Sequence, residues 1–230
     1  MDIATEYKLP VNEIFATLQG EATFAGTPSV FIRLQGCDVA CSWCDTKHTW
    51  ELNPKTFNND FAVITVKEQD KESWSYVKDT ELVDYIQTNF SYITHIVITG
   101  GEPAQYNLVP LCIKLEQLGK TIQIETSGTE ELRISKETWV TLSPKINMPG
   151  NKKLIQASIN RANEIKMPIG KIADIDKLKQ FIIDYKIAKQ IPIWLQALSQ
   201  NPTATKLCIE QAMLHNWKLS VQTHKYLNIR

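Results

Sequence analysis

Short apolar runs rich in β-branched residues alternate along the chain with longer segments in which apolar residues recur every three or four positions. The short runs are bounded by Gly, Pro or polar clusters, which predicts strands, and the longer periodic segments predict helices. The predicted strands cover residues 29–35, 95–99, 121–125, 139–142, 191–198 and 219–223. Helices are predicted after Asp79, over residues 108–119, 154–165 and 175–185, and from Asn201-Pro202 onward.

Strands that alternate with helices predict right-handed βαβ units and a mainly parallel sheet in an α/β fold. The predicted helices are too few for eight βα units, so an open, partial (β/α) barrel is favoured over a closed one. We expect a single domain over residues 1–230, with an insertion at about 51–80 that carries a short strand at 61–66. In such a barrel, functional residues lie at the C-terminal ends of the strands.

The composition is that of an ordinary globular protein, with 43% hydrophobic and 22% charged residues. The 25 basic and 25 acidic side chains balance to zero formal charge, which favours a small-molecule substrate over a nucleic acid. The first residues are acidic where a signal peptide needs positive charge, and no apolar run reaches membrane-spanning length. We therefore expect a cytoplasmic protein without membrane contact, in which cysteines are ligands, catalysts or core residues rather than disulfides.

A loop with three cysteines follows the strand at 29–35. Cys37, Cys41 and Cys44 have the spacing C-x3-C-x2-C, and three thiolates can hold a [4Fe–4S] cluster while leaving one iron open to a substrate or cofactor. The alternative is a zinc site with His48 as the fourth ligand. Two further cysteines, Cys112 and Cys208, lie on apolar stretches of predicted helices and are expected in the core.

The cysteine spacing, with the aromatic Trp43 before the third cysteine, resembles the signature of the radical S-adenosylmethionine superfamily. The segment 99–103, Thr-Gly-Gly-Glu-Pro, resembles the motif with which that superfamily receives the amino group of the cofactor's methionine. Glycines without β-carbons let a ligand approach the backbone at a strand end, and Glu102 offers a carboxylate to an ammonium. The resemblance therefore implies S-adenosylmethionine as a cofactor.

Blocks at 12–21, 31–37, 44–50, 124–128, 143–145 and 219–230 narrow the resemblance to the 7-carboxy-7-deazaguanine synthases. That resemblance implies a lyase on a partial barrel that contracts the ring of 6-carboxy-5,6,7,8-tetrahydropterin with loss of ammonia, in the biosynthesis of queuosine or another 7-deazapurine. A radical derived from S-adenosylmethionine would remove hydrogen from ring carbon 6, and the cofactor would be regenerated. It also implies Mg²⁺, a homodimer and an electron donor such as flavodoxin.

The residues implied for each ligand follow from the same blocks. The substrate would contact Leu18, Gln19, Gly20, Glu21, Arg33, Thr99, Gln196, His224 and Arg230. S-adenosylmethionine would be held by Trp43, Cys44, Asp45, Gly101, Glu102, Ser127, Ser143, Pro144 and Lys145. Mg²⁺ would be bound by Thr46, for which a helix N-cap is the alternative role.

The residue types suit these roles. The planar fork of Arg33 matches a carboxylate, although an ion pair with an acidic neighbour is the alternative. Gln19 both donates and accepts hydrogen bonds while Glu21 only accepts, which suits the edge of a pterin, although a polar turn is the alternative. His224 follows the last predicted strand, and the family's C-terminus reaches the substrate.

Two positions depart from the family pattern. A glycine is common where Ala22 stands, so a positive φ there would be strained, and a proline is common where Ala197 stands. Two competing functions also stay open: an activase that installs a glycyl radical in a protein, and a non-catalytic module stabilised by zinc.

Overall fold

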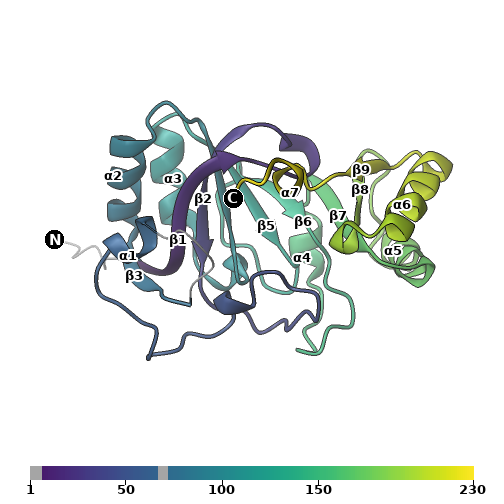
Figure 1. The fold of residues 1–230 in the computed structure, drawn as a ribbon, viewed down its shortest axis with the longest axis horizontal. Coiled ribbons are helices and arrows are strands. Elements are labelled where there is room, and N and C mark those ends of the chain that lie inside the picture. The colour runs from purple at the N-terminus through teal and green to yellow at the C-terminus, as the bar shows by residue number, and fades with distance from the viewer. Residues whose placement is uncertain (1–6, 67–71) are drawn as a thin grey trace.

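The computed structural model describes residues 7–66 and 72–230, and its centre is a single sheet of nine strands in the order β3-β1-β2-β4-β5-β6-β7-β8-β9 (Figure 1). β1 is antiparallel to β2 and β3, and the other neighbouring strands are parallel. The sheet is open, with β3 and β9 at its edges, so the predicted α/β fold with a partial barrel is confirmed. The strands are β1 (Lys8–Leu18), β2 (Pro28–Leu34), β3 (Ser75–Lys78), β4 (His95–Gly100), β5 (Thr121–Thr126), β6 (Trp139–Leu142), β7 (Glu164–Ile169), β8 (Ile193–Ala197) and β9 (Lys218–Ser220).

Helices cover the outer face of this sheet in two groups (Figure 1). α2 and α3 share a hydrophobic core with β1, β2, β4 and β5, whereas α5 and α6 share a second core with β7 and β8. None of the described helices is both long and apolar enough to span a bilayer. The helices are α1 (Ala62–Thr65), α2 (Asp79–Asn89), α3 (Val109–Gln117), α4 (Gln156–Ile159), α5 (Ile172–Asp184), α6 (Pro202–His215) and α7 (Thr223–Leu227).

Residues alternate between the two faces of each strand, and this alternation places polar side chains on the inner face of β5 and β7. In β5, Ile122 and Ile124 belong to the core under the helices, whereas the residues between and after them are Gln123 and Glu125. β7 follows the same rule, with Ile165 and Met167 in the second core and Lys166 between them on the inner face. The concave side of the barrel therefore carries charge and hydrogen-bonding groups.

The loop between β1 and β2 spans the open side of the barrel. The amide of Thr223, just after β9, donates to the carbonyl oxygen of Gly20 at 3.0 Å, and the amide of Ala22 donates to the Ser220 hydroxyl at 3.0 Å. Further along the loop, the Phe24 ring packs tilted against His95 and edge-on against Trp139, at centroid distances of 4.4 and 5.1 Å. The loop thus joins the edge at β9 to the strand β1 and fills one end of the barrel.

Several predicted elements are wrong. The strand expected at 61–66 is absent, and Ala62–Thr65 form the short helix α1 instead. The helix predicted at 154–165 is reduced to the single turn α4. The strand β7 begins at Glu164 because polar and apolar residues alternate there, which buries one set under α5. The last strand is shorter than predicted and gives way to α7, while part of the predicted insertion, residues 67–71, lies outside the described residues.

Both departures from the family pattern are resolved by backbone angles. Ala22 has φ +53°, in the left-handed region that favours glycine, so the strain expected at this position is present. Ala197 has φ −65°, which is the value that proline imposes, so alanine reproduces that backbone without the ring.

Replacing Ala22 by Gly should stabilise the protein. A non-glycine residue in the left-handed region costs on the order of 1–3 kcal/mol of stability. Glycine removes this strain, but it raises the conformational entropy of the unfolded chain, which offsets about 0.5–1 kcal/mol of the gain. We expect a net gain of about 1 kcal/mol, seen as a higher melting temperature of the anaerobically purified protein. Ala25→Gly, at φ −51°, is the matched control and should destabilise; a loss of stability in both variants would contradict strain at Ala22.

Candidate active site

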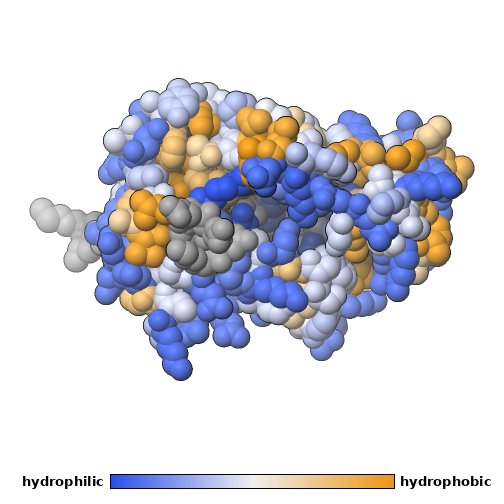
Figure 2. Space-filling model, in the orientation of Figure 1, coloured by the Kyte–Doolittle hydropathy of each residue, from blue (hydrophilic) through white to orange (hydrophobic). Residues whose placement is uncertain are grey.

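One cavity of about 380 Å³ opens at the C-terminal ends of the strands. Figure 2 shows the hollow near the middle of the molecule, with a mostly hydrophilic rim. Every residue that the sequence predicts for the cluster, the cofactor, the substrate or Mg²⁺ lines this cavity, except Pro144, which is buried beside it in the chain. Residues far apart in the sequence, from Leu18 to Arg230, therefore meet at one site.

The cysteine loop is tied together at its neck. The amides of Gly36 and Cys37 donate to the carbonyl oxygens of Thr49 and Trp50 at 2.7 and 2.9 Å. The side chain of Gln35 is buried, and its Nε2 donates to the backbone carbonyls of His48 and Glu51 at 2.9 and 2.7 Å. Its Oε1 accepts a hydrogen bond from the Asn12 side chain at 2.8 Å. The loop that carries the three thiols is thus fixed to the end of β2.

The end of β4 packs against this neck, and the two glycines of the Gly-Gly-Glu segment make that possible. Gly100 has φ +124°, and a β-carbon there would lie 2.2 Å from the carbonyl oxygen of Leu34. A β-carbon on Gly101 would lie 2.0 Å from the carbonyl oxygen of Gly36. The glycines therefore admit the chain's own backbone, in addition to any room they leave for a ligand.

The Cys41 thiol is buried, and the thiols of Cys37 and Cys44 are partly buried beside it. Cys41 forms a buried cluster with Val39 and Met148, against which Cys37 and Cys44 pack. Burial raises the pKa of Cys37 to about 12 and also raises the pKa of Cys41, so both are neutral thiols in the absence of a cation. Iron ions would supply that positive charge, and sulfur is their preferred ligand in clusters, so this set of donors fits an iron–sulfur cluster.

Glu102 is already bonded to its surroundings. Its buried carboxylate accepts hydrogen bonds from the amide of Ala104 at 3.0 Å, the Thr126 hydroxyl at 2.7 Å and the amide of Ser127 at 2.7 Å. A carboxylate can accept about four such bonds, so there is capacity for one ammonium donor. The same contacts fix the end of β5 next to the Gly-Gly-Glu segment.

Two further cofactor candidates stand beside β6. The Lys145 ammonium donates to the Ser143 hydroxyl at 2.5 Å and to its carbonyl oxygen at 3.1 Å, and burial lowers the pKa of Lys145. Ser127 exchanges a hydrogen bond of 2.8 Å with Thr129. This side of the cavity offers hydroxyls and one cation, a set that can bind a ribose and a carboxylate.

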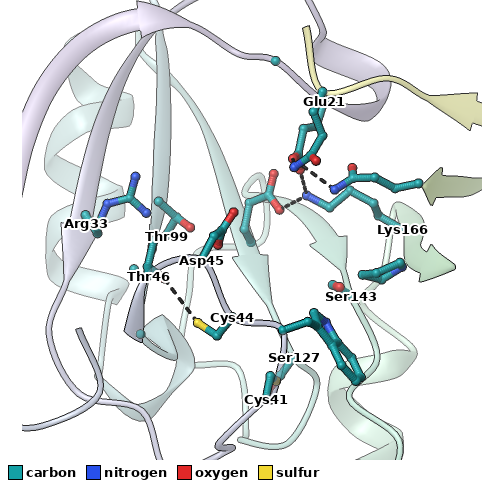
Figure 3. A pocket seen from close by; sticks show the side chains of 18 of the residues that line it. Glu21, Arg33, Cys41, Cys44, Asp45, Thr46, Thr99, Ser127, Ser143 and Lys166 are labelled. Atoms are coloured by element: carbon teal, nitrogen blue, oxygen red, sulfur yellow. Dashed lines mark hydrogen bonds and ion pairs between the residues drawn. The ribbon is translucent and has the colours of Figure 1, made fainter. Parts of the chain in front are cut away.

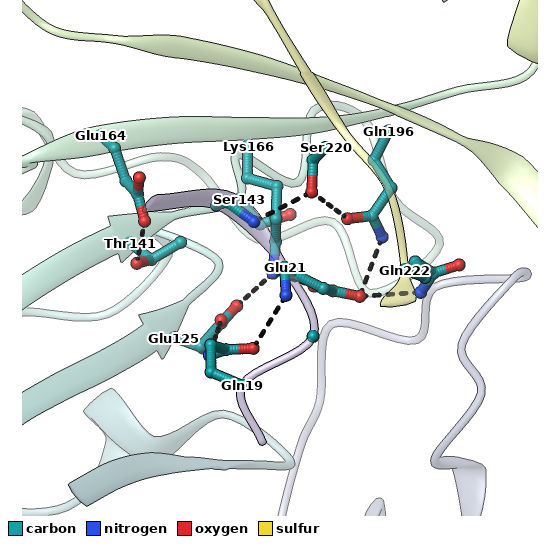
Figure 4. A network of polar contacts seen from close by, with 12 residues as sticks. Gln19, Glu21, Glu125, Thr141, Ser143, Glu164, Lys166, Gln196, Ser220 and Gln222 are labelled. Atoms are coloured by element: carbon teal, nitrogen blue, oxygen red, sulfur yellow. Dashed lines mark hydrogen bonds and ion pairs between the residues drawn. The ribbon is translucent and has the colours of Figure 1, made fainter. Parts of the chain in front are cut away.

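An ammonium shared by two carboxylates forms the opposite wall (Figures 3 and 4). Lys166 on β7 contacts Glu21 in the loop after β1 and Glu125 on β5, and the Lys166 side chain is only 7% exposed. Burial alone would disfavour the charged forms, yet Lys166 holds the pKa of Glu21 well below its usual range, and both carboxylates raise the pKa of Lys166. Burial and the Glu21 charge raise the pKa of Glu125.

Glu21 and Gln19 therefore have partners in the protein before any ligand binds. The Glu21 carboxylate also accepts hydrogen bonds from the side-chain amides of Gln196 at 3.1 Å and Gln222 at 2.7 Å. The Gln19 side chain donates to the Gln123 side chain at 3.2 Å and accepts from the backbone amide of Glu21 at 3.2 Å. The second contact is local, so the alternative role of Gln19 in a polar turn is partly realised. These groups still line the cavity, where they present a fixed set of donors and acceptors.

Arg33 and His224 close the remaining sides. Arg33 donates through Nε to Glu13 at 2.6 Å, which realises the alternative of an ion pair, while the guanidinium still lines the cavity beside Thr99 on the next strand. His224 lies against Gly20, where a β-carbon would come within 2.2 Å of the ring Nδ1. The loop after β1 and the segment after β9 thus enclose the site together.

The sequence interpretation missed Lys166, the role of Glu125, and Gln222. The spacing of apolar residues over 154–165 predicts a helix that ends just before Lys166, so no strand is predicted at this position. The signal lay in the alternation of polar and apolar residues from 164 to 167, which is the period of a strand with one polar face.

Comparisons with known proteins settle the family. A family model described as a 4Fe-4S single cluster domain matches residues 20–161. The 7-carboxy-7-deazaguanine synthase of Escherichia coli (strain K12) is 47% identical over 222 residues, which cover 96% of this chain and 98% of that protein. The chain belongs to the 7-carboxy-7-deazaguanine synthase family. The member of this family from Buchnera aphidicola subsp. Schizaphis graminum is 48% identical over 224 residues, covering 96% of this chain and 99% of that one.

The crystal structure of QueE from Escherichia coli superposes with a TM-score of 0.89 at 45% sequence identity, and the match covers 94% of each chain. Membership of the 7-carboxy-7-deazaguanine synthase family confirms the resemblance drawn from the motifs. The single-cluster match spans Cys37, Cys41 and Cys44, which favours an iron–sulfur cluster over the alternative zinc site.

Replacing Lys166 by Met should destabilise the protein in a pH-dependent way. Without the ammonium, Glu21 and Glu125 face each other with little water, so their pKa values in the folded state rise above the unfolded values. As the pH rises, these carboxyls must ionise in the folded variant, and this ionisation costs stability that is retained at low pH. The free energy of unfolding of the variant should therefore be lower than that of the parent by roughly 3–5 kcal/mol at pH 8, and by less at pH 5.

The matched control is Lys152→Met. Lys152 also bridges two carboxylates, Asp38 at 2.5 Å and Glu130 at 3.1 Å, but its side chain is 34% exposed. An exposed pair is worth under about 1 kcal/mol, so this variant should change little with pH. Equal losses in the two variants, measured by denaturant unfolding, would contradict a special role for the buried ammonium.

Proposed function

We propose that this protein converts 6-carboxy-5,6,7,8-tetrahydropterin to 7-carboxy-7-deazaguanine with loss of ammonia, as a radical enzyme that uses a [4Fe–4S] cluster and S-adenosylmethionine. Relatives that bear the name of this synthase are 47–48% identical over nearly the full chain. The observation that carries the proposal is the convergence of the thiol loop, the Gly-Gly-Glu segment and the Glu21–Lys166–Glu125 wall on a single cavity.

The two sides of the cavity would have different roles, one for the cluster and cofactor and the other for the substrate. Cys37, Cys41 and Cys44 would hold the cluster, and Glu102 with Lys145 would bind the amino-acid part of S-adenosylmethionine. When bound, these groups supply an electron and, from it, a carbon radical able to abstract hydrogen. The chain's own contribution is to place the substrate beside them and to exclude water.

The opposite side suits a pterin that bears a carboxylate. Gln19 and Gln196 offer amides, and Glu21 offers an acceptor, to the amide-like and guanidine-like edge of the ring. Arg33 provides charge-assisted donors for the carboxylate. Because these groups are held by other protein groups, little reorganisation is needed when the substrate binds.

The test of this function is an anaerobic assay. The protein is reconstituted with iron and sulfide, then incubated with S-adenosylmethionine, a reductant and the carboxytetrahydropterin, and the mixture is examined for 7-carboxy-7-deazaguanine. Formation of that product supports the proposal. A fully loaded cluster that cleaves S-adenosylmethionine without using the pterin would favour an activase that acts on a protein instead.

Several finer features belong to the same proposal. We infer a cytoplasmic homodimer that receives electrons from a donor such as flavodoxin and binds Mg²⁺ through Thr46. The Thr46 hydroxyl lies 3.6 Å from the Cys44 sulfur and makes no cap bond at the start of the short helix that follows. A hydroxyl that serves no cap can join water and substrate oxygens around a hard cation.

Thr46→Ala should reduce the stimulation of turnover by Mg²⁺ while keeping the iron content of the protein. Thr46→Ser keeps a hydroxyl at the same place and is the matched control, so it should retain most of the stimulation. Turnover is measured against Mg²⁺ concentration for both variants and the parent protein. Identical Mg²⁺ dependence in all three proteins would argue against Thr46 as a ligand.

Alanine at Cys37, Cys41 or Cys44 should abolish a stable cluster, because two thiolates leave two irons without a protein ligand. Cys112→Ala and Cys208→Ala are the controls, since both cysteines are fully buried in hydrophobic cores and should cost only packing. Iron and sulfide are quantified per chain in all five variants. A full iron content in Cys41→Ala would contradict the assignment.

A further inference from the structure

Four buried polar side chains form a row across the inner face of the sheet. They lie on four neighbouring strands and are between 0 and 3% exposed: His95 on β4, Gln123 on β5, Thr141 on β6 and Glu164 on β7. His95 Nε2 lies 2.9 Å from Gln123 Oε1, and Gln123 Nε2 lies 2.8 Å from Thr141 Oγ1. The Thr141 hydroxyl lies 2.6 Å from Glu164 Oε1, as Figure 4 shows. We call these four residues the polar row.

Glu164 sets the direction of the hydrogen bonds at one end of the polar row. The backbone amide of Thr23 donates to Glu164 Oε2 at 3.3 Å, and the Thr23 hydroxyl donates to the same oxygen. A carboxylate only accepts, so the single hydrogen of the Thr141 hydroxyl points to Glu164 Oε1. The Thr141 oxygen is left with lone pairs only, and its neighbour on β5 must therefore be a donor.

The orientation of the Gln123 amide follows from this direction. Its Nε2 donates to Thr141 Oγ1 and to Glu125 Oε1 at 3.3 Å, so both amide hydrogens have an acceptor. Its Oε1 then faces His95 and Gln19. The two ends of an amide have almost the same shape, so the surrounding donors and acceptors decide which end is the oxygen. Here the decision comes from two carboxylates, one acting through Thr141 and one directly.

His95 closes the other end of the polar row as a neutral ring. A carbonyl oxygen only accepts, so His95 donates to Gln123 through Nε2. Burial lowers the pKa of His95, which leaves Nδ1 without a proton and able to accept from the Thr121 hydroxyl at 3.2 Å. The ring is also held by its contact with Phe24. His95 thus favours the same orientation of the Gln123 amide that Thr141 favours from the other side.

Gln19 carries this orientation into the cavity. Its Nε2 has two hydrogens and two protein acceptors, Gln123 Oε1 at 3.2 Å and Glu125 Oε1 at 3.3 Å. Its Oε1 accepts from the backbone amide of Glu21 at 3.2 Å, and a carbonyl oxygen has two lone pairs. Gln19 lines the cavity. It therefore has one acceptor site, and no donor, left for a ligand there.

We propose that the polar row fixes the Gln19 carbonyl as an acceptor in the cavity, and that the site thereby selects a ligand with an N–H donor at that place, the amino group on ring carbon 2 of the pterin. The inference rests on the proposed function for the identity of the substrate. None of the four residues of the row lines the cavity, so they are positioning residues that act through Gln19.

Glu164→Gln removes the direction of the row with almost no change in shape. The backbone amide of Thr23 can only donate, so the carbonyl of the new side chain would face Thr23 and its NH2 group would face Thr141. The Thr141 hydrogen then has no carboxylate to point to, and it can donate to Gln123 instead. The Gln123 amide is no longer held in one orientation, and neither is the Gln19 amide that it contacts.

The test compares two unreactive ligands that differ at ring carbon 2. Pterin-6-carboxylate carries the amino group, and lumazine-6-carboxylate carries an oxygen in its place. Their Kd values are measured by anaerobic calorimetry on the protein with an oxidised, fully loaded cluster and S-adenosylmethionine. The parent should bind the pterin about tenfold more tightly, because the lumazine oxygen would face the Gln19 carbonyl without a hydrogen between them. In Glu164→Gln the two Kd values should become nearly equal.

Glu116→Gln is the matched control. Glu116 also accepts a hydrogen bond from a hydroxyl, that of Ser135, but it lies on α3 and does not line the cavity. This variant should keep the parent's ratio of Kd values. A merely structural role of Glu164 would weaken both ligands equally and leave the ratio unchanged.

A second pair of variants tests the middle of the row. Thr141→Val removes the acceptor of Gln123 and should lower the ratio as Glu164→Gln does, whereas Thr141→Ser keeps the hydroxyl and should restore the ratio. The parent's ratio in both Glu164→Gln and Thr141→Val would overturn the proposal. Equal Kd values for the two ligands in the parent, or no binding of either, would overturn the selection by Gln19.

The tautomer of His95 gives a readout that needs no ligand. Nitrogen NMR of the histidine-labelled parent should show His95 protonated at Nε2 and bare at Nδ1, because Gln123 offers only its oxygen. In Glu164→Gln the same signals should shift as the Gln123 amide turns. A proton on Nδ1 with a bare Nε2 in the parent would contradict the direction of the row.

Failure of the proposed function would give a different result. A parent that forms no 7-carboxy-7-deazaguanine, yet prefers the pterin and loses that preference in Glu164→Gln, would support the polar row without the reaction. A parent that forms the product while its preference is the same in every variant would support the reaction and overturn the row.

Discussion

The Lys166 ammonium, shared between Glu21 and Glu125, joins β7, β5 and the loop after β1 on the inner face of an open sheet. A mainly parallel sheet is normally buried on both faces, whereas here one face is polar and borders a cavity. Two carboxylates could not lie in so dry a place without a cation. Once Glu21 is held there, it can accept from Gln196 and Gln222, and the loop after β1 is drawn across the open side of the barrel.

The thiol loop depends on a different constraint, which is backbone contact. The neck of the loop and the end of β4 approach so closely that only glycine fits at 100 and 101. Glu102 then joins the end of β5 to this pair, so three neighbouring strand ends are held in one arrangement. The thiol side and the charged side of the cavity face each other, as a reaction that needs both a cluster and a polar substrate requires.

Local motifs were predictable from the sequence, whereas long-range partners were not. The spacing of Cys37, Cys41 and Cys44 and the Gly-Gly-Glu segment depend on nearby residues, so the sequence alone located both. Lys166 was missed because the spacing of apolar residues over 154–165 favours a helix, and only burial of alternate residues of β7 under α5 decides for a strand. The partners of Arg33 and Glu21 come from distant parts of the chain. The sequence therefore predicted which hydrogen bonds these side chains can make, but not that protein partners already take up some of them.

The central claim is that the two sides of this cavity bring ring carbon 6 of the carboxytetrahydropterin to the radical site. The direct measurement is isotope transfer: the substrate carries deuterium at carbon 6, the reconstituted protein is allowed to turn over, and S-adenosylmethionine is recovered and analysed by mass spectrometry. The account predicts deuterium in the recovered cofactor. Product formation with all deuterium retained elsewhere and none in the cofactor would contradict it.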